Sequence, residues 1–133
     1  MVANSKSGGA ADKSLYDRVG EEPLRRVVHA FYQGVAGDPA LRALYPEEDL
    51  GPAEERLALF LIQYWGGPSI YSERRGHPRL RMRHVGFHID TAARDLWLKH
   101  MRTAVDDAGL APADRDELWA YLEYAANFMV NAD

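Results

Sequence analysis

The chain has 133 residues, 47% of them hydrophobic, and a formal net charge of −4. This length suits one domain with a single hydrophobic core. The sequence contains no cysteine, which excludes disulfides, iron–sulfur clusters and thiolate ligation of a metal. No stretch approaches the ~20 apolar residues that a membrane-spanning helix needs. The acidic balance and the lack of recognised nucleic-acid-binding motifs argue against a nucleic acid as partner.

Small and polar residues make up the start of the sequence, from Met1 to Asp12. This stretch lacks the apolar core of a signal peptide. We therefore expect residues 1–13 to be a disordered tail, residues 14–133 to form the domain, and the protein to be cytoplasmic.

From residue 14 onwards, apolar residues recur with the spacing of amphipathic helices. Ser14, with an acidic residue three positions later, predicts a capped short helix that stops at Gly20. The next helix has Pro23 in its first turn and ends at Gly37. A brief helical turn over residues 40–44 follows it.

Proline and glycine mark the predicted helix ends in the middle of the chain. Pro52 starts a third helix, whose inner face carries Ala53, Leu57, Phe60, Leu61 and Tyr64, and Gly66 breaks it. Residues 67–77 are predicted to be a loop. A short helix then runs from Pro78 to about His84.

Two long helices complete the predicted fold. Asp90 or Thr91 caps the first, which carries Trp97 on its inner stripe and stops at Gly109. Pro112 opens the second. The expected buried face of this last helix is Leu118, Tyr121, Leu122, Ala125, Phe128 and Met129. No alternating strand pattern appears anywhere, so the predicted class is all-α, as a compact sandwich of helices.

The segment that ends at His84 differs from the rest of the chain, because five arginines lie between positions 74 and 83. A positive segment around one histidine, between apolar helices, suits haem, a flat apolar cofactor with a metal and two carboxylates. The histidine would supply an axial nitrogen and arginines would face the propionates. The alternatives without a cofactor are a solvated charged face, a surface histidine, or a local phosphate site.

His84 and His88 are four residues apart, so on one helix face the two histidines could instead bind a metal ion together. Gly86 between them weakens any helix that would carry both. No carboxylate completes such a site in the sequence, so we favour His84 alone.

A set of short strings carries a resemblance to a known family: Phe31-Tyr32, Leu44-Tyr45-Pro46, Ala53-Glu54-Glu55-Arg56-Leu57, Tyr64-Trp65-Gly66-Gly67-Pro68, the segment from Arg74 to His84, and Trp97. Together with the order of the helices, they resemble the second group of truncated haemoglobins over about residues 14–131. The resemblance implies a two-over-two helical sandwich around haem b. One departure is Gly20-Glu21-Glu22-Pro23, where the family often has two glycines.

The resemblance implies a role for each matching position on the cofactor. His84 matches the proximal ligand of the iron. Of the arginines, Arg79 with Arg74 or Arg83 is expected to pair with the propionates. The full set of expected cofactor contacts is Leu57, Arg74, His77, Arg79, Met82, Arg83, Phe87 and His84.

On the ligand side, the resemblance places Tyr32, Tyr45 and Trp97 as hydrogen-bond donors, with Ala53 and Leu57 in the distal pocket. Bound dioxygen carries partial negative charge and accepts such bonds. Each bond to a charged acceptor contributes about 1.5–3 kcal/mol, which slows release by about ten- to a hundred-fold. Taken alone, Tyr32 and Trp97 would more often be core aromatics.

These residues predict a protein that binds dioxygen and other diatomic ligands at a five-coordinate haem iron. An alternative is a redox enzyme that uses the same haem for nitric oxide dioxygenation or peroxide reduction, with an external reductase. A third hypothesis, a haem-free helical interaction module, fails if the purified protein has a Soret band. Exposed tyrosines and the last helix also allow a homodimer.

Overall fold

The computed structural model describes residues 13–132 of the chain. This part is helical and contains no strand, which confirms the predicted all-α class. Its helices are α1 (Leu15–Val19), α2 (Glu21–Ala36), α3 (Pro39–Arg42), α4 (Gly51–Tyr64), α5 (Ile70–Arg75), α6 (Leu80–Arg83), α7 (Thr91–Asp106) and α8 (Pro112–Met129). Of the tail expected over residues 1–13, only Lys13 belongs to the described residues.

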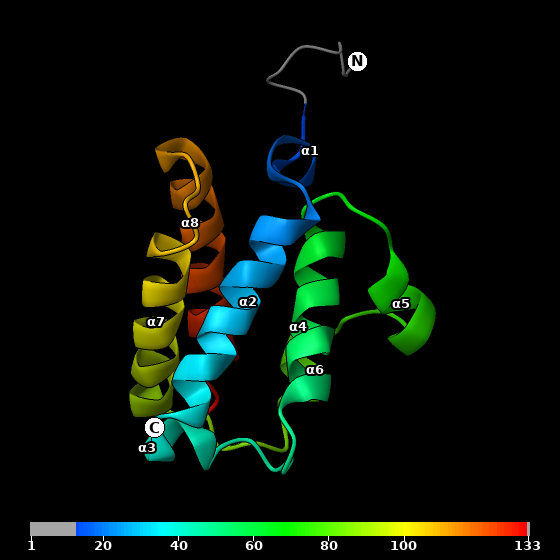
Figure 1. Cartoon of the computed structure of the whole chain (residues 1–133). Coiled ribbons are helices and arrows are strands. Elements are labelled where there is room, and N and C mark those ends of the chain that lie inside the picture. The colour runs from blue at the N-terminus through cyan, green and yellow to red at the C-terminus, as the bar shows by residue number, and fades with distance from the viewer. Residues whose placement is uncertain (1–12, 133) are drawn as a thin grey trace.

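Four long helices form the frame of the fold. α2 packs against both α4 and α7, and α7 packs against α8 (Figure 1). The pair α2 and α4 and the pair α7 and α8 make the expected two-over-two sandwich. Fully buried side chains fill the space between the pairs: Leu24, Phe31, Leu61, Met101, Leu118 and Leu122. Burial of each such side chain contributes about 1.5–3 kcal/mol.

Local signals in the sequence account for where several helices begin. The Ser14 hydroxyl accepts a hydrogen bond from the Asp17 amide at 3.1 Å, and the Asp17 carboxylate accepts one from the Ser14 amide. This is the predicted capping box. Asp90 caps α7 by accepting from the Ala93 amide at 2.8 Å. The corner between α1 and α2 needs one glycine only: Gly20 has φ +81°, which glycine adopts without steric cost.

The prediction of a loop over residues 67–77 is wrong, because α5 occupies Ile70–Arg75. Contacts with α4 stabilise this short helix. The Gln63 amide group accepts from the Ser72 amide at 2.9 Å and donates to the Ser72 hydroxyl at 2.7 Å. The buried Tyr71 ring packs edge-on against Phe60, with 5.7 Å between ring centroids. A six-residue helix held by tertiary contacts leaves little periodicity in the sequence.

Three further expectations differ from the structure. The short helix α6 begins at Leu80 rather than Pro78, because Arg79 has a left-handed backbone with φ +43°. Tyr64 and Phe128, both expected on inner faces, are 50% and 45% exposed. Tyr64 stacks on Tyr121 at 4.0 Å instead of entering the core.

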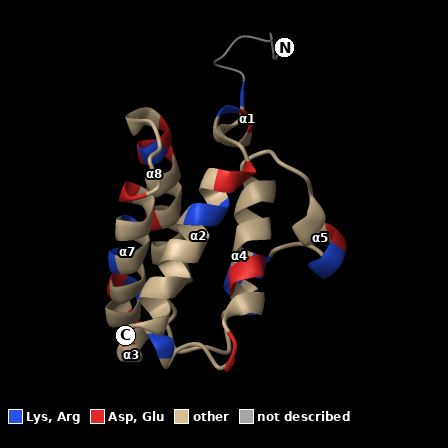
Figure 2. Ribbon diagram, in the orientation of Figure 1, with Lys and Arg blue, Asp and Glu red and all other residues tan. Residues whose placement is uncertain are grey.

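Charged residues of both signs lie next to one another on the surface (Figure 2). Arg25 pairs with Glu21 at 2.6 Å and Arg102 pairs with Asp106 at 3.2 Å, both across one helical turn. Such exposed pairs contribute about 0.2–1 kcal/mol each. None of the helices in residues 13–132 combines the length and the apolar character that crossing a membrane requires.

Candidate functional site

A cavity of about 700 Å³ lies among the helices and takes its lining from α2 through α8. This volume is within the range of about 300–1,000 Å³ that is typical of cofactor and ligand pockets. Eight of the predicted site residues line it: Tyr32, Tyr45, Ala53, Leu57, Arg83, His84, Phe87 and Trp97. The fold therefore brings together positions that are up to 65 residues apart, from Tyr32 to Trp97.

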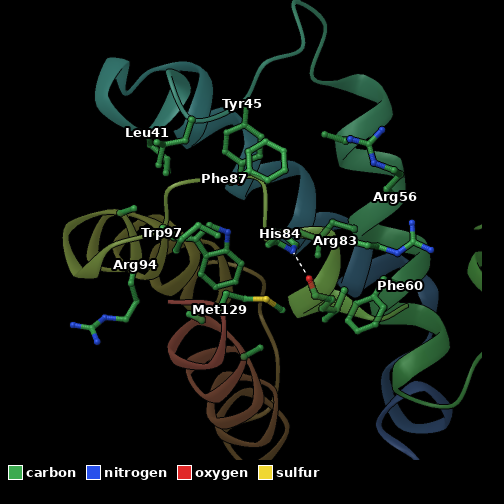
Figure 3. Close-up of a pocket in the computed structure, with 18 of the residues that line it drawn as sticks. Leu41, Tyr45, Arg56, Phe60, Arg83, His84, Phe87, Arg94, Trp97 and Met129 are labelled. Carbon is green, nitrogen blue, oxygen red and sulfur yellow. Dashed lines mark hydrogen bonds between the residues drawn. The ribbon is translucent and has the colours of Figure 1, made fainter. Parts of the chain in front are cut away.

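His84 follows directly after α6, and its ring is hydrogen-bonded to the main chain. Nδ1 lies 2.6 Å from the carbonyl oxygen of Leu80, one turn earlier (Figure 3). A carbonyl oxygen can only accept, so Nδ1 is the donor in this contact, and in the neutral ring Nε2 is then the nitrogen with the lone pair. A neutral imidazole whose other nitrogen donates to a backbone carbonyl is the usual form of a metal-binding histidine. His84 is thus suited to hold an iron at the cavity wall.

An aromatic group with polar edges forms another part of the lining. The Tyr32 and Tyr45 rings meet edge-on at 5.7 Å, and the Phe31 ring lies 5.1 Å from the Tyr32 ring and 5.1 Å from the Trp97 ring. The indole nitrogen of Trp97 faces the side of the cavity where Tyr45 lies (Figure 3). This group brings two hydroxyls and one N–H to the same cavity.

Burial keeps both tyrosine hydroxyls protonated. It raises the pKa of Tyr32 far above its usual value, and the neighbouring Tyr45 adds to the rise. Burial also raises the pKa of Tyr45 to about 12, although hydrogen bonding with Tyr32 and Trp97 acts in the opposite direction. Both side chains therefore remain hydrogen-bond donors at neutral pH. Ala53, on α4, is 4% exposed and contributes only a methyl group to the lining.

The arginine segment divides into residues that line the cavity and residues that do not. Arg75 and Arg83 line it. Four of the expected cofactor contacts lie outside the lining: Arg74, His77, Arg79 and Met82. Met82 is 64% exposed, and the His77 ring accepts from the Arg79 amide at 3.2 Å. Of the four, only Met82 belongs to α6, where it precedes the cavity-lining Arg83, and successive positions on a helix point in different directions.

Arg83 organises the connection between α5 and α6. Its guanidinium donates to the carbonyl oxygens of Pro78 at 2.6 Å, Arg75 at 2.7 Å and His77 at 3.1 Å. Three bonds to main-chain acceptors fix the position of the chain just before His84. Removing a side chain with these contacts leaves carbonyl groups without a donor, which is costly where water cannot replace it.

The expected cofactor contacts left out three arginines that line the cavity: Arg75 within the arginine segment, and Arg56 and Arg94 outside it. Arg56 pairs with Glu47 at 2.5 Å and lies on the same side of the cavity as Arg83, whereas Arg94 lies on the other side (Figure 3). A signal for Arg56 was present, since it follows Ala53 by three residues and so shares a helix face with it.

Three of the four other histidines have carboxylate neighbours. His29 lies 3.0 Å from Glu54, and the His100 ring lies 2.8 Å from Asp38. His88 lines the cavity and lies 3.4 Å from Asp90. Among residues 13–132, no group of three or more His, Cys, Asp or Glu is arranged to hold a metal ion.

Comparison with known proteins agrees with this geometry. The family profile described as bacterial-like globin matches residues 14–131. Group 2 truncated hemoglobin YjbI of Bacillus subtilis is 41% identical over 123 residues, which cover 92% of each chain.

Two solved haemoglobin structures are similar to this chain in both sequence and fold. A thermostable hemoglobin from Thermobifida fusca is 61% identical, covers 89% of this chain and 97% of its own, and superposes with a TM-score of 0.87. A truncated haemoglobin from Bacillus subtilis, described as oxygen-avid, is 41% identical with a TM-score of 0.84, over 90% of this chain and all of that one. Globins hold haem iron on a proximal histidine. The chain belongs to the bacterial-like globin family, within the group II truncated haemoglobins.

Proposed function

We propose that this globin binds haem b in the cavity with His84 as the only protein ligand of the iron, and that it holds dioxygen tightly. The observation that carries the proposal is the combination of two features in one cavity. His84 has its Nδ1 committed to the Leu80 carbonyl, which leaves Nε2 for the iron. Tyr32, Tyr45 and Trp97 supply donors to the same space.

The residues of the cavity suit the different parts of this cofactor. Apolar side chains such as Leu57 and Phe60 would pack against the flat macrocycle, and Phe87 lies 6.1 Å from the His84 ring. Arg56, Arg75 and Arg83 are the cations that would face the propionates. When bound, haem supplies an iron centre that takes a diatomic ligand; every other interaction comes from the chain itself.

The distal donors account for tight binding. Dioxygen draws negative charge onto its outer atom when it binds, and hydrogen bonds from fixed donors stabilise that charge. Ala53 has no hydrogen-bond donor, so the hydroxyls of Tyr32 and Tyr45 and the indole N–H of Trp97 would donate the hydrogen bonds to the bound ligand. The oxygen-avid character ascribed to the similar Bacillus subtilis protein agrees with this interpretation.

Absorption spectroscopy and stopped-flow kinetics test the proposal. The purified protein, supplied with haem, is expected to have a Soret band and a five-coordinate ferrous spectrum. Dioxygen release should be slow, and carbon monoxide release less dependent on the donors, because bound carbon monoxide carries less charge. A protein without a Soret band would contradict haem binding, and fast dioxygen release would contradict the role of the donors.

A pair of neighbouring arginines tests which cations serve the propionates. Arg74 and Arg75 are both exposed, but only Arg75 lines the cavity, with its guanidinium 5.9 Å from the Tyr71 ring. We expect Arg75→Ala to lose haem about five-fold faster, which is the loss of about 1 kcal/mol from a partly solvated ion pair. Arg74→Ala is the matched control. The measurement is haem transfer to an apoglobin acceptor, and equal rates for the two variants would make Arg75 a surface charge only.

A further inference from the structure

The segment that follows His84 depends on a side chain from the other end of the domain. Residues 84–90 connect α6 to α7, and within them Val85, Phe87 and His88 are exposed. Burial therefore does little to fix this segment. Asn131 lies just beyond the end of α8 at Met129, and it makes contact with the segment from there.

Asn131 uses both ends of its carboxamide. Its Nδ2 donates to the carbonyl oxygens of His84 at 3.2 Å and Phe87 at 3.0 Å. Its Oδ1 accepts from the Ile89 amide at 2.9 Å. An asparagine side chain has two N–H donors and one carbonyl acceptor, so one residue satisfies three main-chain groups of the segment. An alanine or an aspartate cannot do the same.

Main-chain bonds extend this connection. The amides of Asn131 and Ala132 both donate to the Ile89 carbonyl, at 2.9 Å and 3.2 Å. The end of the described chain and the segment after His84 are thus joined by five hydrogen bonds, three of them through one side chain. Residues 42 to 47 positions apart are held together in this way.

His84 is consequently held at two points. Its ring is tied to the Leu80 carbonyl through Nδ1. Its own carbonyl accepts from the Phe87 amide at 3.0 Å and from Asn131. With its main chain and its ring both fixed, the imidazole has little freedom to tilt, so Nε2 keeps one direction relative to the cavity.

We propose that Asn131 is a positioning residue for His84, which clamps the segment after it and so sets the orientation of the axial imidazole. This inference rests on the proposed haem site. It assigns to the chain end a part in cofactor retention that none of the cavity-lining residues performs, because Asn131 does not line the cavity.

Asn131→Asp is the sharpest variant, because it preserves size and the acceptor for Ile89 but replaces the donor with a carboxylate oxygen that faces two carbonyls. Asn131→Ala removes the contacts without adding charge and serves as the second variant. Asn127→Ala is the matched control, since Asn127 is also near the end of α8 but bonds to Glu123 of its own helix and to Arg94.

Three measurements are made on each holoprotein: haem transfer to an apoglobin acceptor, the iron–histidine stretching band of the ferrous form, and the melting temperature. We expect Asn131→Asp to lose haem about ten-fold faster, the equivalent of about 1.4 kcal/mol, with a shifted or broadened iron–histidine band. Asn131→Ala should change the rate of haem loss and the iron–histidine band in the same direction, but by less than Asn131→Asp does. Asn127→Ala should leave both unchanged.

The outcomes separate the possible roles. If both Asn131 variants melt earlier but keep the wild-type rate of haem loss and the wild-type band, Asn131 is only a structural tie and the proposal is overturned. If the wild type binds no haem, the proposed function fails instead. Amide hydrogen exchange over residues 84–89 then still tests the clamp: faster exchange in Asn131→Asp supports it, and equal exchange overturns it.

Discussion

Replacing His84 with alanine is expected to leave a folded protein that retains little or no haem. The imidazole is half-buried at the cavity wall, and its Nδ1 bond to the Leu80 carbonyl leaves Nε2 free for the iron. Loss of a hydrogen-bond partner of a metal ligand typically costs about 10–100-fold in affinity, and loss of the ligand itself should exceed that. The measurement is haem content after reconstitution, together with the rate of haem transfer to an acceptor.

Two other histidines serve as controls for this variant. His29 pairs with Glu54 and does not line the cavity, so His29→Ala should bind haem normally. His88 does line the cavity, so His88→Ala tests whether it can act in place of His84. His84→Gly supplied with free imidazole should recover a five-coordinate ferrous spectrum. Full haem content with an unchanged spectrum in His84→Ala would contradict the assignment.

Replacing Trp97 with phenylalanine is expected to speed dioxygen release by at least about ten-fold. The change keeps an aromatic body against Phe31, 5.1 Å away, and removes only the N–H donor. One lost bond to a charged acceptor corresponds to about 1.5–3 kcal/mol, which is at least ten-fold in rate if the ground state alone is affected. Stopped-flow measurement of dioxygen release from wild type and variant gives the ratio of the two release rates.

The same release measurement is made on two tyrosine variants, and with carbon monoxide as a second ligand. Tyr32→Phe or Tyr45→Phe should each have a smaller effect, because the remaining donors rearrange and effects of contacting residues are not additive. Carbon monoxide release should change less than dioxygen release in all three variants. If Trp97→Phe releases dioxygen at the wild-type rate, the indole is a packing residue and the proposed network of donors is wrong.

Most of the frame of this fold follows from signals that act within a few residues. The capping box at Ser14, the cap at Asp90 and the proline at the start of α8 each set a helix end at the predicted place. α5 could not be found in this way, because the bonds from Gln63 and the burial of Tyr71 that stabilise it come from α4. Short helices held by distant contacts carry no periodic pattern of their own.

The candidate site was also predictable only in part, because some of its residues are placed by local sequence signals and others by distant contacts. The places of His84, Tyr32 and Trp97 in the cavity lining were predictable, because helical periodicity and the family resemblance agree on them. Which arginines line the cavity was not predictable, because the left-handed backbone at Arg79 decides how the segment enters α6. The role of Asn131 depends on where the end of α8 lies, and nothing near it in the sequence signals that.

The raised pKa of the two distal tyrosines has a consequence for alkaline solutions. A free phenol loses its proton near pH 10, whereas the pKa of Tyr45 is about 12 and that of Tyr32 is raised further. Because the folded chain holds these protons more tightly than the unfolded chain does, their contribution to folding stability is complete below about pH 10 and is lost as the pH rises toward about 12. Dioxygen release measured from pH 7 to pH 10 should therefore be nearly constant. A globin with these phenols would keep both hydroxyls as hydrogen-bond donors in an alkaline medium in which a free phenol has already ionised.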